Sequence, residues 1–156
     1  MLSKLRKGKT VMAKSISNME QLASAMTPIL KGMVDELAER VYQTLNFFLQ
    51  DYYNGYKPES YRRQYNFLRS AVKVEPKVSG NTVTAYVYID TNYMNNYYNA
   101  TGIQVATWAN NGFHGGIVVD HDPHVWNDTI ENTVGNGDLL KLALEYLRSK
   151  GFTVRA

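Results

Sequence analysis

The sequence contains no cysteine, so disulfides cannot stabilise this chain. It also lacks any apolar run near the roughly 20 residues that a membrane span requires. No apolar segment follows the basic residues at the start, and we therefore expect neither a secretion signal nor contact with a membrane. Together these absences predict a soluble protein that is made in the cytoplasm.

Motifs of the common enzyme classes are missing as well. There is no HExxH pair, and the Gly-Phe-His-Gly-Gly run at 112–116 lacks the Lys-Ser/Thr of a phosphate-binding loop. No nucleophile motif supports a catalytic triad. We expect no enzymatic activity and no cofactor.

One short segment does carry side chains of the metal-ligating types, but without the spacing of a known site. Asp122 and Pro123 within it are more simply explained as the start of a helix. We expect no metal, and a metal-dependent hydrolase is kept only as an alternative. The side chains in question are His114, Asp120, His121 and His124.

The formal net charge of +3 is unevenly distributed. Residues 1–14 contain five basic side chains and no acid, which leaves the remaining chain at −2. We interpret 1–14 as a basic arm and 15–156 as a single domain, because 156 residues suffice for one hydrophobic core. The arm is either a solubilising terminus or a contact for nucleic acid or an acidic subunit, through Lys4, Arg6, Lys7 and Lys9.

A long amphipathic helix is predicted from Asn18 onwards. Asn18 can cap it, with Gln21 completing a capping box. Pro28 either kinks the helix or starts a new one, and Gly55 offers a left-handed end. The acids at 35, 36 and 39 and Arg40 are expected on the outer face. The apolar stripe comprises Leu22, Met26, Ile29, Leu30, Met33, Leu37, Val41, Leu45, Phe48 and Tyr52.

An antiparallel hairpin is the clearest local signal. Residues 82–89 alternate between apolar and polar or aromatic side chains, and a Ser79-Gly80-Asn81 turn precedes them. The Asn- and Tyr-rich residues 91–104 are expected to form a long loop, with a strand or helical turn around Val105. A short strand at 117–119 and helices at about 123–134 and 138–150, the second capped by Asp138, complete an α+β fold. In this fold the long N-terminal helix packs on a small antiparallel β-sheet.

A spaced aromatic run connects the helix to the hairpin: Tyr56, Pro58, Tyr61, Arg63 and Tyr65, followed by Leu68 and Ser70. This Tyr-x-Pro-x-x-Tyr-x-Arg-x-Tyr pattern, the long helix before it and the glycine-dense 112–116 run resemble the neck or tail-component family of long-tailed bacteriophages. The resemblance covers about residues 19–116.

The resemblance implies a structural virion protein: a head–tail connector or tail-completion ring that joins the capsid portal complex to the tail tube. The expected partners are further copies of the chain, in a hexamer or possibly a dodecamer, and the neighbouring head-completion, tail-terminator or tail-tube proteins. DNA would pass through the lumen without sequence-specific binding, in a particle assembled in the bacterial cytoplasm. The expected subunit-interface residues are Tyr61, Arg63, Tyr65, Phe67, Tyr93, Tyr97, Tyr98, Phe113 and His114.

Another class of function is compatible with the same residues. Arg62, Arg63 and Arg69 alternate with tyrosines, as in proteins that bind single-stranded nucleic acid by charge and base stacking. The negative charge of residues 15–156 argues against this alternative. Arg beside Tyr is equally typical of protein–protein contacts.

Overall fold

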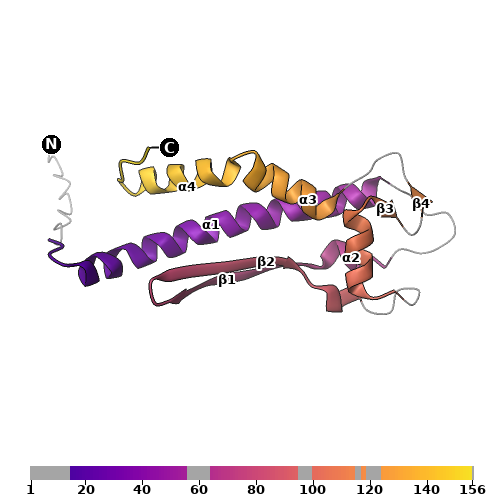
Figure 1. Cartoon of the computed structure of the whole chain (residues 1–156), viewed down its shortest axis with the longest axis horizontal. Coiled ribbons are helices and arrows are strands. Elements are labelled where there is room, and N and C mark those ends of the chain that lie inside the picture. Colours follow the sequence, from indigo (N-terminus) through magenta and orange to yellow (C-terminus); the bar gives the residue numbers. More distant parts are fainter. Residues whose placement is uncertain (1–14, 56–63, 95–99, 115–116, 119–123, 156) are drawn as a thin grey trace, which may run out of the picture.

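The computed structural model describes residues 15–55, 64–94, 100–114, 117–118 and 124–155. One long helix, α1, forms the middle layer, with a β-hairpin on one side and the C-terminal helices on the other (Figure 1). The elements are α1 Met19–Asn54, η1 Phe67–Arg69, β1 Ala71–Ser79, β2 Thr82–Ile89, η2 Thr91–Met94, α2 Gly102–Asn110, β3 Phe113–His114, β4 Ile117–Val118, α3 Val125–Ile130, the π-helical turn η3 Glu131–Gly135 and α4 Asp138–Ser149.

Helix α1 begins where the sequence predicts. The Asn18 side chain accepts a hydrogen bond from the Gln21 backbone N–H at 2.8 Å. In a capping box the Gln21 side chain would accept a hydrogen bond from the backbone N–H of Asn18. Here it accepts from the N–H of Ser17, one residue earlier, so the predicted capping box is incomplete. The helix continues through Pro28 without ending. Gly55 is right-handed, with φ −66°, so the predicted left-handed end at this position is wrong.

The hairpin confirms the predicted strands and turn. Val72 lies opposite Tyr88 and Val74 opposite Tyr86, and Gly80 supplies the positive φ of the turn. The register shifts between Val74 and Lys77, which is a β-bulge around Pro76. The α+β class, with a long helix on a small antiparallel sheet, is confirmed. The second sheet, β3–β4, is only a two-residue pairing.

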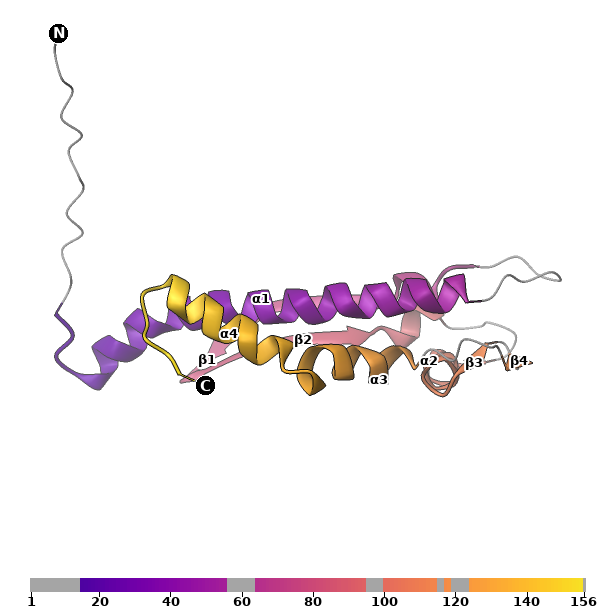
Figure 2. The same ribbon diagram turned by 90° about the horizontal axis from the view of Figure 1, so that it is seen from above.

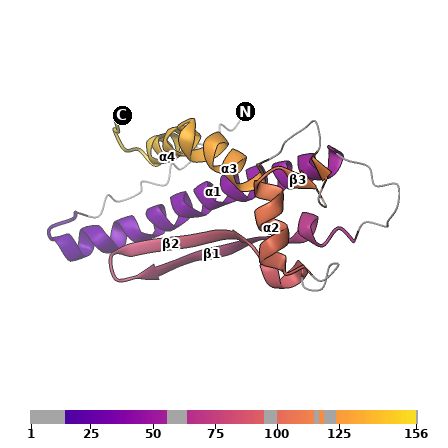
Figure 3. The same cartoon turned by 45° about the vertical axis from the view of Figure 1, so that its right-hand side comes forward.

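The region predicted as a long loop contains two helical segments. The Thr101 hydroxyl accepts from the Gln104 N–H, and the Gln104 side chain accepts from the Thr101 N–H, which is a complete capping box for α2. A Cβ at Gly102 would overlap the Thr91 carbonyl oxygen, so only glycine lets α2 approach η2 this closely. Helix α2 crosses the end of the hairpin beside α1 (Figure 3).

The C-terminal helices differ from prediction at their starts. Helix α3 begins at Val125 with His124 as its N-cap residue, and residues 122 and 123 lie outside the described part of the chain. Helix α4 follows a left-handed Gly137, so Asp138 is its first residue and not its cap. Helix α4 runs back along α1 in the opposite direction (Figure 2). Among the described residues, no helix is long and apolar enough to cross a membrane.

The fully buried core lies at one end of the molecule. Leu45 and Leu49 of α1 have no exposed surface, and rings from α1 and η1 pack beside them. The N-terminal half of α1 contains no fully buried side chain, and neither does α4, although one face of α4 is strongly apolar. The core cluster is Leu45, Leu49, Tyr52, Phe67, Met94, Ala109 and Val125.

Three charged residues of α1 form ion pairs with the layers on either side of the helix. Lys73 of β1 points towards α1 and lies 2.9 Å from a carboxylate oxygen of both Asp35 and Glu39. On the other side of the helix, the Arg40 Nε lies 3.2 Å from an Asp138 carboxylate oxygen of α4. These three α1 side chains still have 43–47 % of their surface exposed, so they lie at the margins of the outer face, where the hairpin and α4 meet the helix.

The ion pair between the layers shifts the titration of both partners. The hydrogen bond from Lys73 is the main reason that the pKa of Glu39 lies below 4.5, and Gln43 adds a second bond. Hydrogen bonds to Glu39 and Asp35 raise the pKa of Lys73 above 10.5. Glu39 therefore stabilises the fold above pH 4.5 and loses this contribution as the pH falls through its folded-state pKa. The Lys73 contribution is complete below pH 10.5 and is lost as the pH rises through its raised pKa.

We expect Leu49→Ala to lower the free energy of unfolding by about 2–5 kcal/mol, because it leaves a cavity in a fully buried site. Leu140→Ala is the matched control: it removes the same atoms from a side chain that is 60 % exposed. The control should change stability by less than about 0.5 kcal/mol. Chemical denaturation measures both. Equal effects of the two substitutions would contradict the position of the core.

We expect Lys73→Met to lower stability at neutral pH, because it leaves two neighbouring carboxylates without their cation. The difference from the native chain should shrink in acid, once Glu39 is protonated in both proteins. Denaturation at a series of pH values measures this difference. Lys77→Met, on the exposed part of the same strand, serves as the control. A difference that is the same at neutral and acidic pH would show that the ion pair is not its cause.

Candidate assembly surface

The outer face of the hairpin presents aromatic rings to solvent. Because cross-strand partners share a face, Val72, Val74, Tyr86 and Tyr88 lie together on the side away from α1. Tyr86 is 61 % exposed and Tyr88 is 45 % exposed. Tyrosine combines a large apolar ring with a polar tip, which suits a surface that becomes buried in a complex. We call these four residues the tyrosine face.

The two edges of the hairpin are protected to different degrees. Natural edge strands are blocked against further pairing by proline, lysine or a bulge. Strand β1 has all three around Pro76 and Lys77, whereas β2 contains no charged residue and no proline over its eight residues. No third described strand pairs with either edge. The edge of β2 beside the tyrosine face is therefore the less protected of the two edges.

Aromatic rings also cluster where α1 ends. Tyr53 stacks on Tyr65 with ring centroids 5.4 Å apart, and Tyr52 meets Phe67 edge to face at the same distance. Tyr65 has φ +59°, an unusual backbone conformation for a residue with a side chain. The stacked ring holds this strained residue with its side chain still 42 % exposed. Of the predicted contact residues before the hairpin, Tyr65 is therefore well placed to meet a partner.

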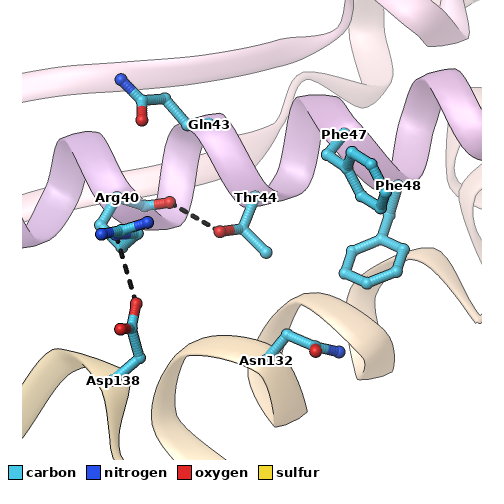
Figure 4. A pocket seen from close by; sticks show the side chains of 7 residues that line it. All are labelled: Arg40, Gln43, Thr44, Phe47, Phe48, Asn132 and Asp138. Carbon is cyan, nitrogen blue, oxygen red and sulfur yellow. Dashed lines mark hydrogen bonds and ion pairs between the residues drawn. The ribbon is translucent and has the colours of Figure 1, made fainter.

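A shallow groove of about 320 Å³ lies between α1 and the C-terminal helices (Figure 4). The Arg40–Asp138 ion pair lies at one end of the groove and the rings of Phe47 and Phe48 at the other. Phe47 is 64 % exposed and stands edge to face against Phe48 at 5.2 Å. The remaining lining is polar, from Gln43, Thr44 and Asn132. The groove holds no arrangement of acid, base and nucleophile.

The predicted contact residues fall into four groups. Two of them are exposed to solvent: Tyr93 in η2, and Tyr65, which stacks on Tyr53. Phe67 belongs to the core of the subunit, so its ring is occupied within the fold; a contact role for it stays a prediction. Phe113 and His114 form β3, and their side chains lie outside what the structure describes. The other predicted residues lie outside the described part of the chain: Tyr61, Arg63, Tyr97, Tyr98, Lys4, Arg6, Lys7 and Lys9.

His124 has a structural role where the sequence suggested a metal ligand. Its Nδ1 lies 2.8 Å from the Asn110 carbonyl oxygen, and its backbone N–H donates to Asp128. The described residues contain no group of three histidine or acidic side chains that could hold a metal ion. Asp120 and His121 lie outside these residues.

Asn110 joins α2 to α3, a role that sequence patterns do not indicate. Its side-chain oxygen accepts from the backbone N–H groups of Trp126 and Asn127, both at 2.9 Å. These are two of the free N–H groups in the first turn of α3. The cap comes from a residue distant in sequence, whereas capping rules consider only neighbours. Asn110 thus fixes the orientation of the C-terminal helices at the aromatic end of the molecule.

Comparison with known proteins places the chain in one family. The family model described as YomN matches residues 18–149, which covers every described helix and both hairpin strands. No curated protein sequence and no solved structure matches the chain.

Proposed function

The chain belongs to the YomN family, which is derived from phage, and from this premise we propose that it is a structural protein of the phage particle. Its proposed place is the neck: a head–tail connector or tail-completion ring between the portal complex and the tail tube. In this role the chain binds copies of itself and neighbouring virion proteins, and it catalyses no reaction.

The tyrosine face is the observation that supports this proposal best. Soluble monomers rarely present adjacent exposed aromatic rings beside an uncharged, unprotected strand edge, because such surfaces promote association. A virion subunit buries such a surface when it assembles. We propose that the neighbouring virion protein contacts the hairpin here, with main-chain hydrogen bonds along β2 and packing on the tyrosines.

The charge balance supports a role that involves DNA passage without DNA binding. The described residues contain nine lysines and arginines and eleven aspartates and glutamates. Each phosphate contact strengthens DNA retention, so a net negative body suits a channel through which DNA slides. The arginines and basic arm that favour single-strand binding lie outside the described residues, apart from Arg69. No described surface favours that alternative.

We expect Tyr86→Ser/Tyr88→Ser to block particle assembly while leaving the subunit folded, because both side chains point away from α1 into solvent. The variant is introduced into the phage genome. Filled heads and free tails should accumulate separately in electron micrographs, and mass spectrometry should find less of the chain in purified particles. Circular dichroism and thermal unfolding of the purified variant should match those of the native chain.

Phe47→Ser is the matched control, since it removes an equally exposed ring from the other side of α1. Particles carrying it should join heads to tails normally. Normal head–tail joining by the double tyrosine variant would contradict the proposed use of the hairpin. Absence of the native chain from infectious particles would contradict the structural role itself.

A further inference from the structure

The apolar side of α1 is longer than the helix that covers it. Helix α4 is level with Arg40 at its start, where Asp138 forms the ion pair, and with Gly32 near its end, where the Tyr146 ring meets the glycine. It ends three residues later, at Ser149. The first turns of α1 therefore project beyond α4 and beyond the turn of the hairpin (Figures 1 and 2).

These projecting turns expose apolar side chains. Every residue from 15 to 25 is exposed, and Met19 has 77 % of its surface in solvent. Leu22 and the half-buried Met26 follow Met19 at spacings of three and four, which places all three on one side of the helix. A short helical end gains its stability mainly from tertiary packing, and here it has little. We call Met19, Leu22 and Met26 the projecting end.

The side of α1 on which the projecting end lies is the side that α4 covers further along. Leu22 precedes Arg40 by 18 positions, which is about five full turns of an α-helix. The two side chains therefore point in the same direction from α1, and Arg40 meets α4. Within one copy, a C-terminal helix thus packs on the continuation of the projecting end.

A second exposed apolar surface lies on the C-terminal helices themselves. Val134 of η3 is 58 % exposed, Leu140 of α4 is 60 % exposed, and Ile130 is exposed one turn before Val134. We call these three residues the C-terminal strip. Its length is about two to three helical turns, like that of the projecting end, so the two surfaces match in both chemistry and size.

The C-terminal strip faces away from the groove beside α1. Thr133 is fully buried, and Asn132, the residue before it, lines the groove. Val134, the residue after it, is turned about 100° in the opposite sense. Leu140 follows Asp138, which also lines the groove, by about 200° around α4. Both side chains therefore lie on the flank that α1 does not cover.

The projecting end and the C-terminal strip cannot meet within one copy. The ion pair holds the start of α4 level with Arg40, and Met19 lies 21 positions earlier on the same helix. At about 1.5 Å per residue, α1 separates the two surfaces by roughly 30 Å. Only two different copies can therefore bring them together.

From these surfaces we propose that the projecting end of one copy packs on the C-terminal strip of the next copy. The contact repeats between copies the packing of a C-terminal helix on α1 that exists within each copy. It joins two different surfaces, so it is heterologous and the array can close into a ring. This deepens the proposed neck function, on which it rests for the place of the ring in the particle. The tyrosine face remains available for the neighbouring virion protein.

The small size of the contact determines how it must be measured. Two to three helical turns bury less than the roughly 800 Å² per partner of a standard interface. Two free copies therefore associate weakly, whereas each copy in a closed ring makes the contact twice. A method that traps transient contacts is needed.

Disulfide trapping suits the chain because it contains no cysteine. Met19→Cys and Leu140→Cys are made in separate full-length chains and mixed under mild oxidation. A disulfide requires Cα atoms within about 7 Å, so the mixture should give a covalent heterodimer. Either chain alone should remain monomeric by intact mass spectrometry. A chain that carries both substitutions should form closed covalent rings, whose mass gives the number of copies.

Two controls separate the contact from random collision. Glu36→Cys places the thiol on the exposed middle of α1, and its mixture with Leu140→Cys should give no heterodimer. Adding Leu22→Asp to the Met19→Cys chain should abolish the trapped heterodimer. Ser24→Asp, an equal charge change on the opposite side of the same exposed turns, should leave it unchanged.

Three results would overturn the contact. These are a mixture that gives no more heterodimer than the Glu36→Cys control, trapping that Leu22→Asp does not reduce, and Met19→Cys dimers that form as readily as the heterodimer. The last result would show that two projecting ends meet each other instead.

The trapping experiment uses the purified chain, so it is independent of the phage role. Covalent rings from a chain that is absent from phage particles would support the contact and remove the neck function. Conversely, a chain that is present at the neck but gives no trapped heterodimer would keep the function and overturn the contact.

Discussion

The hairpin and the C-terminal helices both depend on packing against α1. Its C-terminal half supplies the two side chains with no exposed surface, Leu45 and Leu49, and rings from η1 and side chains from η2, α2 and α3 close around them. A small two-stranded sheet is at best marginally stable alone, so the hairpin needs this helix as a support. Lys73 adds a charged anchor between the two, and Arg40 adds one to α4 on the opposite side. A single rigid helix thus fixes the hairpin relative to the C-terminal helices.

The buried core is distributed unevenly along α1. Full burial is concentrated where five elements meet at the end of α1. Towards the N-terminus of α1 only the distal hairpin and α4 remain, and apolar residues such as Leu142 and Tyr146 are only half-buried. Apolar surface of this kind gains stability when a second chain covers it. The exposed tyrosines of β2 are apolar surface of the same kind on the outside of the molecule.

Sequence patterns predicted the elements whose signals are local. Asn18 and Gln21 marked the start of α1, and strict alternation over 82–89 with the Gly80 turn located the hairpin. The capping box at Thr101 was equally local, but the Asn- and Tyr-rich context favoured a loop. What depends on tertiary contacts could not be predicted. Asn110 caps α3 through two residues that lie 16 and 17 positions later in the sequence. Lys73 pairs with Asp35, which lies 38 positions earlier.

The candidate surface was predicted only in part, because it too depends on tertiary contacts that local sequence patterns do not show. Period-2 alternation places Tyr86 and Tyr88 on one face, yet it does not tell which face the helix covers. Phe67 looked like a contact residue because of its tyrosine-rich neighbours, whereas the edge-to-face contact with Tyr52 places it in the core.

Electron cryomicroscopy of the neck of the native phage particle tests the central claim most directly, because it locates the chain and its contacts in one measurement. The claim that this subunit is a neck component predicts a closed ring of the chain between capsid vertex and tail tube. It also predicts the Tyr86 and Tyr88 rings packed against a neighbouring protein. A particle whose neck lacks the chain, or a ring in which these tyrosines face open solvent, would contradict it.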